Sequence, residues 1–183
     1  MPKNMPKTFA FLRAINVGGH TVTMAELKAQ FEALGLRGVE TFIASGNVVF
    51  EAGRAGEAAL GRRLGAHLEA TLGFPVTVFL RSGAELAALV AGCPFNAAEQ
   101  AEARAMNVIL LQAPLTGPQE ARLLGLQTGE DDFRIRGRDV WWRCRTKQSQ
   151  SDFSNVVFEK ALGLKATFRG LSTLQRLAAK HLP

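Results

Sequence analysis

The stretch that decides the fold is Phe9-Ala-Phe-Leu-Arg-Ala-Ile-Asn-Val-Gly-Gly-His20, in which an apolar run ends in a polar loop with two adjacent glycines. The apolar run is typical of a buried strand, which we predict over residues 8–14. Thr23 and Glu26 have the spacing of a capping box, so we predict that a helix follows over residues 24–34. The chain therefore opens with a strand, a loop and a helix.

The rest of the chain repeats and extends this order. In the first half the patterns predict strands over 39–44 and 48–51, a helix over 57–72 and a strand over 76–80. In the second half they predict a strand over 106–111, a helix over 118–126, strands over 132–136 and 140–145, a helix over 153–162, a strand over 166–169 and a last helix after Ser172. Each half therefore reads βαββαβ, the order of a ferredoxin-like unit.

We therefore predict an α+β protein of two tandem ferredoxin-like (βαββαβ) subdomains, with mainly antiparallel sheets and an extra C-terminal helix. Residues 1–92 form the first subdomain with a connecting helix, residues 93–183 form the second, and the two pack as one compact protein. Each half has a glycine-containing hairpin turn at the same place, Ser45-Gly-Asn47 and Gly137-Arg-Asp139.

Composition indicates a globular protein in the cytoplasm. Of the 183 residues, 47% are hydrophobic and 21% are charged, which is ordinary for a soluble domain. We find no apolar run of roughly 18 residues and no secretion signal, so we predict no membrane partner. Cys93 and Cys144 are isolated, which favours reduced thiols. The net charge is +6, and the basic excess lies in the C-terminal half, which should attract polyanions.

A ligand site is predicted where the first strand ends. In a ferredoxin-like sheet the third strand pairs with the first, so the loop after strand one meets the hairpin between strands two and three. Glycine amides and a helix N-terminus at that edge suit an anion. The alternative is that these residues only turn the chain. The site would comprise Arg13, Asn16, Gly18, Gly19, His20, Ser45, Gly46 and Asn47, with His20 and Ser45 as weak catalytic candidates.

A basic sheet face is predicted in the second half. The strand period of two puts Arg134, Arg136, Trp141, Arg143 and Arg145 on one side, opposite a core side of Phe133, Ile135, Val140, Trp142 and Cys144. Arginines beside an aromatic side chain suit single-stranded nucleic acid, although the consensus of RNA-binding modules is absent. The alternative is that the arginines coat a solvated face and that Trp141 packs against the other subdomain.

A polar loop near the C-terminus supplies a third group, Lys147, Ser151, Asn155 and Arg169. Ser151 or Asp152 is the predicted N-cap of the next helix, and capping explains these residues without a ligand. Lys147 and Arg169 would suit an anion. Glu130-Asp-Asp132 is the only tight acidic cluster and has no histidine, so we read it as a solvated turn. We predict no metal and no cofactor.

Three segments resemble a known family. Residues Phe11-Leu-Arg-Ala-Ile-Asn-Val-Gly-Gly19, Ser45-Gly-Asn-Val-Val-Phe50 and the stretch from Ser151 to Arg169 are similar to signatures of the bacterial DUF1697 family, a domain of unknown function. The resemblance covers nearly the whole chain and implies a two-subdomain α+β fold without an established activity. The sequence departs from the family pattern at Asp152, where lysine is common, and at Gly170-Leu171-Ser172, where Asn-Trp and a polar residue are common.

The function predicted from these features is binding of a phosphate-bearing ligand, either nucleic acid or a nucleotide. The glycine-rich edge and the basic face would both take part. One alternative is a small-molecule enzyme with an anion-binding cleft at the same edge, using His20 as acid or base. Another is a protein-interaction module that uses an exposed strand at residues 76–80.

Overall fold

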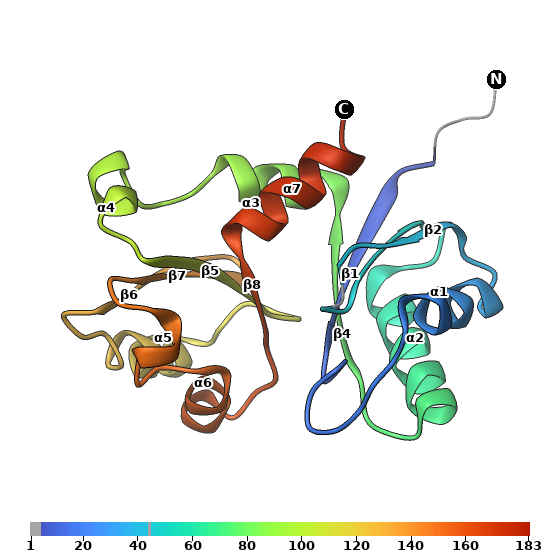
Figure 1. The fold of residues 1–183 in the computed structure, drawn as a ribbon, viewed down its shortest axis with the longest axis horizontal. Coiled ribbons are helices and arrows are strands. Elements are labelled where there is room, and N and C mark those ends of the chain that lie inside the picture. The colour runs from blue at the N-terminus through green and yellow to red at the C-terminus, as the bar shows by residue number, and fades with distance from the viewer. Residues whose placement is uncertain (1–4, 44) are drawn as a thin grey trace. The chain divides into compact units, whose positions relative to one another are not determined.

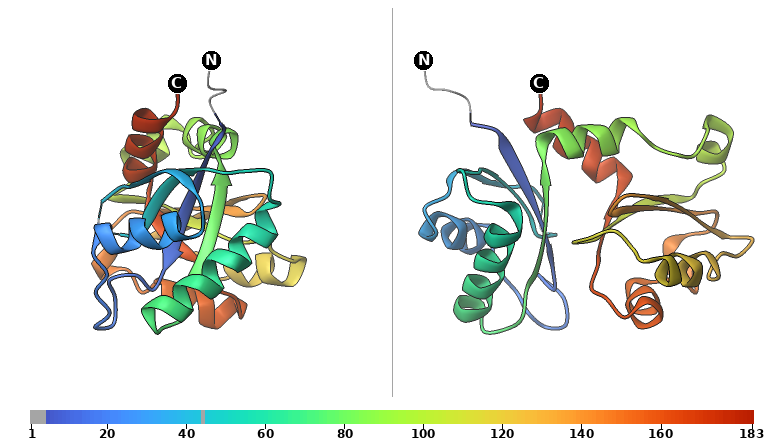
Figure 2. Two further views of the ribbon diagram at one scale, coloured as in Figure 1. Left: turned by 90° about the vertical axis from the view of Figure 1, so that its right-hand side faces the viewer. Right: turned by 180° about the vertical axis from the view of Figure 1, so that it is seen from behind.

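The computed structural model describes residues 5–43 and 45–183 and divides the chain into two compact units. Unit 1 comprises the chain up to Ala87 together with His181–Pro183, and unit 2 comprises Ala88–Lys180. Figure 1 labels the elements, and Figures 1 and 2 show α1 and α2 on one face of the unit 1 sheet and α5 and α6 on one face of the unit 2 sheet. Among the described residues, no helix is both long and apolar enough to cross a membrane.

Unit 1 is a four-stranded antiparallel sheet with two helices. Its elements are β1 (Lys7–Arg13), α1 (Met24–Ala33), β2 (Arg37–Thr41), β3 (Asn47–Glu51), α2 (Glu57–Leu72) and β4 (Thr77–Ser82). The strand order is β2-β3-β1-β4, which is the ferredoxin-like order. Strand β2 begins before the predicted residue 39 and ends at Thr41, and Ala44, the predicted end, lies outside the described residues. Helix α3 (Gly83–Ala91) follows β4.

Unit 2 repeats this topology. Its elements are α4 (Ala97–Ala101), β5 (Ala105–Leu110), α5 (Gly117–Leu124), β6 (Asp131–Arg136), β7 (Asp139–Cys144), the 3-10 turn η1 (Gln148–Gln150), α6 (Asn155–Leu162), β8 (Thr167–Gly170) and α7 (Leu171–His181). The order β6-β7-β5-β8 matches that of unit 1 strand for strand. The tandem ferredoxin-like fold and the extra C-terminal helix are thus confirmed.

Apolar side chains under the helices form a core in each unit. In unit 1, Phe31 and Leu64 from the helices meet Leu12 and Phe50 from the sheet, and all four are buried. In unit 2, the core side predicted for β6 and β7 is confirmed, because Phe133 and Trp142 pack with Phe153 and other aromatic residues. These cores leave the opposite face of each sheet free of α1, α2, α5 and α6.

Two helices differ from the expectation. Asn96 and Glu99 form a capping box that begins α4, a helix that was not predicted. Helix α6 begins at Asn155 with Ser154 as its N-cap, so the predicted caps Ser151 and Asp152 were wrong. Ser151 cannot cap the helix because its hydroxyl is bonded to Asp131 and to the Phe153 amide.

Candidate functional site

The loop after β1 and the β2–β3 hairpin meet at one end of the unit 1 sheet. Phe11 pairs with Asn47, and the Leu12 amide donates to the Gly46 carbonyl at 2.8 Å. Gly46 has a φ of +74°, and a Cβ there would lie 3.1 Å from the Leu12 Cβ. The glycine is therefore needed both for its conformation and for the close approach of the two segments.

The two asparagines at this end hold the shape of the loops. Asn16 has a φ of +56°, and its side-chain oxygen accepts a 2.7 Å hydrogen bond from the Val22 amide. Asn47 is fully buried, and its side-chain nitrogen donates to the Phe42 carbonyl at 2.9 Å and to the Ser45 hydroxyl at 2.8 Å. Asparagine tolerates the left-handed region and closes local turns, so both residues have a structural role.

The N-terminus of α1 is occupied by its own capping box. The Glu26 amide donates to the Thr23 hydroxyl at 3.1 Å, and the Glu26 carboxylate accepts from the Thr23 amide at 2.8 Å. The hydrogen bonds from the Thr23 backbone and hydroxyl lower the pKa of Glu26. An ionised carboxylate therefore already lies at the helix end where an external anion was predicted to bind.

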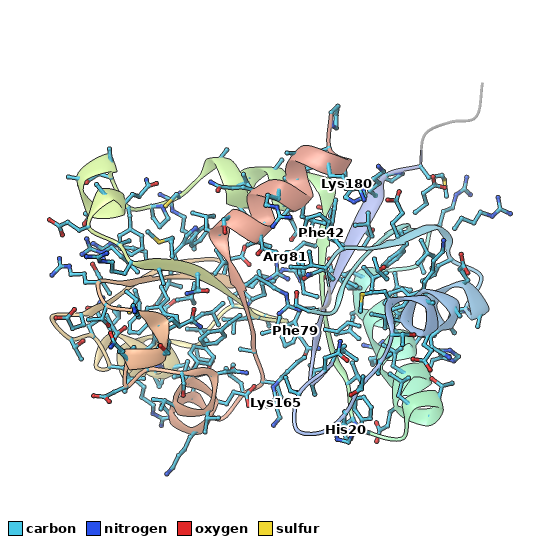
Figure 3. All side chains as sticks on the ribbon, in the orientation of Figure 1. His20, Phe42, Phe79, Arg81, Lys165 and Lys180 are labelled. Carbon is cyan, nitrogen blue, oxygen red and sulfur yellow. The ribbon has the colours of Figure 1, made fainter. Side chains whose placement is uncertain are left out.

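The remaining loop residues are on the surface. Gly18 and Gly19 have φ values of +61° and +86°, and an added Cβ would meet nothing within 4 Å. Their conformation alone accounts for glycine. The exposed His20 ring stacks on Phe74 with its centroid 4.0 Å away, in the loop marked in Figure 3. Arg13 is half-buried at the end of β1.

The predicted basic face of unit 2 is covered by the chain's own residues 92–102, which we call the covering segment. The Phe95 ring of this segment lies 4.8 Å from the Arg134 guanidinium carbon and 5.3 Å from that of Arg143. Glu99 pairs with Arg134 at 3.3 Å, and Glu102 pairs with Arg143 at 3.5 Å. The positive charge of this face is therefore largely neutralised within the unit.

Other members of the basic face also have internal partners. Arg136 donates to the Gly92 carbonyl at 2.7 Å, and Arg145 donates to the Gly129 carbonyl at 2.9 Å. Asp132 accepts from both Arg134 and Arg143. Trp141 and Arg143 are only 2% and 3% exposed. The face is thus a partly buried ionic cluster and not a row of solvated arginines.

The polar loop of unit 2 is anchored on Asp131. This carboxylate is 3% exposed, and it accepts from the Trp142 indole at 2.7 Å and from the Ser151 hydroxyl at 2.9 Å. The acidic cluster read as a solvated turn therefore supplies the buried anchor of the loop. Lys147 is exposed at the start of η1. Burial lowers the pKa of Arg169 to about 10, and its guanidinium donates to the Thr167 hydroxyl at 2.7 Å.

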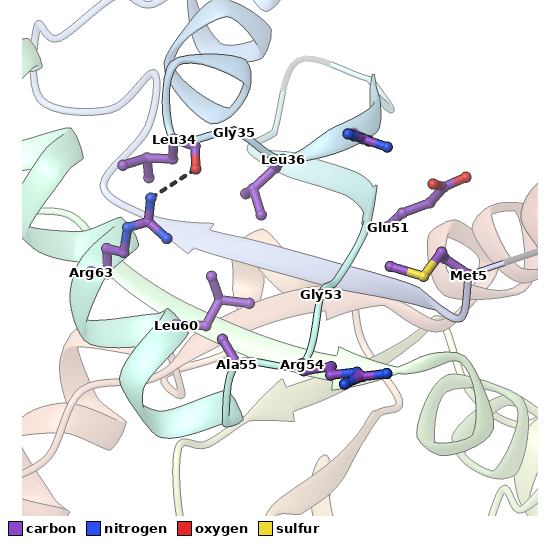
Figure 4. Close-up of a pocket in the computed structure, with 11 residues that line it drawn as sticks. Met5, Leu34, Gly35, Leu36, Glu51, Gly53, Arg54, Ala55, Leu60 and Arg63 are labelled. Atoms are coloured by element: carbon purple, nitrogen blue, oxygen red, sulfur yellow. Dashed lines mark hydrogen bonds between the residues drawn. The ribbon is translucent and has the colours of Figure 1, made fainter.

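A pocket of about 340 Å³ in unit 1 was not foreseen from the sequence. Three arginines line it: Arg37 at the start of β2, Arg54 in the loop after β3 and Arg63 on α2. Figure 4 labels Arg54 and Arg63 beside the pocket. Its apolar wall includes Leu34, Leu36 and Leu60. The arginines come from three elements without a motif spacing, so no single stretch of sequence signals the pocket.

The arginines of this pocket differ in their contacts. Arg63 donates from its Nη2 to the Leu34 carbonyl at 2.8 Å, which bonds it to the C-terminal end of α1. Arg37 and Arg54 are exposed, and no side-chain hydrogen bond or ion pair joins either to another described residue. Glu51 is the one carboxylate of the lining, and its side chain lies over Gly38.

Taken together, the two sheets define a tandem ferredoxin-like α+β protein. The chain belongs to the family described as "Protein of unknown function (DUF1697)", whose model matches residues 5–141. Its structure is similar to that of the conserved bacterial protein SP0830 from Streptococcus pneumoniae, with a TM-score of 0.73 and 23% identity, over 96% of this chain and 98% of that chain. At this identity the likeness shows the fold alone. The search of curated proteins gave no match.

Proposed function

We propose that this protein binds a small phosphate-bearing ligand, of which a mononucleotide is the first candidate, in the arginine-rimmed pocket of unit 1. The observation that carries this proposal is the set of three arginines around an apolar-walled pocket of about 340 Å³. Ligand pockets in proteins usually measure roughly 300–1,000 Å³. The volume therefore suits a small molecule and not a folded polymer.

The chemistry of the rim suits phosphate. Guanidinium groups bind phosphate through paired N–H donors and remain charged at neutral pH. Arg37 and Arg54 have no side-chain partner among the described residues, so binding would not require them to leave one. The leucine side chains of the wall would cover the apolar part of the ligand. Glu51 adds one negative charge, which favours a ligand with a hydrogen-bond donor beside its phosphate.

The other two predicted regions are weaker candidates for a small anion. At the glycine-rich edge, the side-chain amides of Asn16 and Asn47 are already hydrogen-bonded within their own loops. The Glu26 carboxylate occupies the N-terminus of α1. On the basic face of unit 2, the covering segment supplies the counter-charges. The enzyme alternative has only His20 and Ser45 as candidate catalytic groups, and the His20 ring stacks on Phe74. We therefore propose binding and not turnover.

Calorimetric titration tests this proposal, with inorganic phosphate and adenosine monophosphate as separate probes at low salt. The variant Arg37→Ala/Arg54→Ala removes two rim charges. The control Arg62→Ala/Arg122→Ala removes two exposed charges outside the pocket. A hydrogen bond to a charged group contributes about 1.5–3 kcal/mol, so we expect at least a tenfold loss in the first variant and no loss in the control. Equal losses, or no binding of either probe to the wild type, would refute the proposal.

A further inference from the structure

The covering segment of unit 2 places its side chains where a single-stranded nucleic acid would place its own groups. The Phe95 ring lies against the guanidinium groups of Arg134 and Arg143, at 4.8 and 5.3 Å. The carboxylates of Glu99 and Glu102 lie beside the same two arginines. Bases stack on arginine planes and phosphates bind their N–H groups, so a ring and two anions reproduce both kinds of contact.

The covering segment leaves donors of this face unsatisfied. Among the described residues, neither the Trp141 indole nitrogen nor the Nε of Arg143 has a hydrogen-bond acceptor, although both atoms are buried. A buried donor without an acceptor is unfavourable, because it has lost its hydrogen bonds to water without replacing them. The face therefore has two hydrogen-bond donors that its own chain does not use. Both lie on β7, where Trp141 pairs with Arg134 of β6 and Arg143 pairs with Asp132 of β6.

Most side chains of the covering segment are not buried. Helix α4 has only five residues and buries none of them. The side chain of Glu102 is 61% exposed, and its oxygen lies 3.5 Å from both Arg143 and Arg145. Exposed ion pairs of this kind contribute little to stability. Phe95, at 2% exposure, is the main anchor. Displacement of the segment would require the Phe95 ring to leave and the ion pairs of Glu99 and Glu102 to break. The hydrogen bonds that Arg136 and Arg143 donate to the Gly92 and Glu99 carbonyls would also break.

We propose that the face formed by Arg134, Trp141 and Arg143 binds single-stranded nucleic acid, and that the covering segment competes with this ligand for the same arginines. This inference is independent of the pocket in unit 1. The ligand's bases replace the Phe95 ring, and its phosphates replace the carboxylates of Glu99 and Glu102. An acidic peptide could replace the carboxylates of Glu99 and Glu102 but would have no ring to replace that of Phe95. It serves as the alternative ligand in the test.

Fluorescence polarisation of labelled ten-nucleotide oligo(dT) and oligo(U) against the full chain tests the inference. The variant Glu99→Gln/Glu102→Gln weakens the covering segment. Glutamine at position 99 keeps the capping box, as Gln119 does after Thr116. The control Glu69→Gln/Glu120→Gln changes the net charge equally at two exposed positions away from this face. The single variant Glu102→Gln, at a mostly exposed side chain, remains interpretable if the double variant does not fold.

We expect Glu99→Gln/Glu102→Gln to bind at least tenfold more tightly than the wild type, and the control to match the wild type. Adding Arg134→Ala should abolish the gain. Single-strand binding loses affinity with a log–log salt slope of about 0.7 per phosphate contacted, so two arginines predict a slope of about 1.4. The inference is overturned if both double variants bind alike, or if a glutamate peptide binds Glu99→Gln/Glu102→Gln as tightly as the oligonucleotides do.

Discussion

Replacing Gly46 with alanine tests whether close contact between β1 and the β2–β3 hairpin holds the edge of unit 1 together. At a φ of +74° an alanine is disfavoured by about 1–2 kcal/mol. Its Cβ would also lie 3.1 Å from the Leu12 Cβ and 3.3 Å from the Ile15 Cβ. Overpacking of this kind costs about 1–3 kcal/mol. We therefore expect Gly46→Ala to lower the free energy of unfolding by about 2–5 kcal/mol.

Gly35→Ala is the matched control, because Gly35 has a φ of +78° but an added Cβ there meets nothing within 4 Å. The control should lose only the conformational part, about 1–2 kcal/mol. Urea unfolding followed by far-ultraviolet circular dichroism gives both values, and hydrogen exchange of peptides from β1 and β3 locates the loss in unit 1. If the two variants are equally destabilised, the close contacts at Gly46 do not contribute to stability, and the reasoning fails.

Three further changes test the local networks. Asp131→Ala removes the acceptor of the Trp142 indole and should destabilise unit 2 by about 3 kcal/mol, measured by urea unfolding followed by tryptophan fluorescence. Glu26→Gln tests the capping carboxylate, whose pKa is lowered in the folded state. The stabilisation by the ionised Glu26 is therefore present above the unfolded-state pKa and is lost as pH falls through the folded-state pKa. In acid unfolding curves, the difference in stability between wild type and variant should shrink. Asn16→Ala removes the acceptor of the Val22 amide and places alanine at a φ of +56°. It should speed hydrogen exchange at Val22, with a loss of about 1–3 kcal/mol.

The fold could be predicted because local and long-range signals agree. The capping box at Thr23 and the left-handed glycine at the end of α2 are local features, and the structure contains both. The alternation in β6 and β7 separates Phe133 and Trp142 from Arg134 and Arg143, and the helices cover the apolar side as expected. Periodicity thus identified the elements, and their order identified the topology.

The sites could not be predicted to the same degree, because a side chain's availability depends on its partners. The polarity of Asn47 suggested a ligand, yet it is fully buried and bonded to its own hairpin. The alternation of the arginines was correct, but nothing in the β6–β7 pattern indicates that Phe95 and Glu99 lie over them. Conversely, Arg37 and Arg54 have no periodic relation and meet only in the folded unit.

Comparison of the two units separates what the topology requires from what unit 1 adds. The Leu12 amide donates to Gly46, and the Leu111 amide donates to Arg138, so the same hydrogen bond joins the first strand to the hairpin in both units. The helix that follows begins with a threonine capping box in each, at Thr23 and at Thr116. Eleven positions separate Leu12 from Thr23, whereas five separate Leu111 from Thr116. Unit 2 therefore makes the connection from its first strand to its first helix with six fewer residues than unit 1. The topology does not require the longer glycine-containing loop of unit 1. Its hydrogen bonds show how the loop is stabilised, but the shorter connection in unit 2 shows that chain reversal alone does not explain its length.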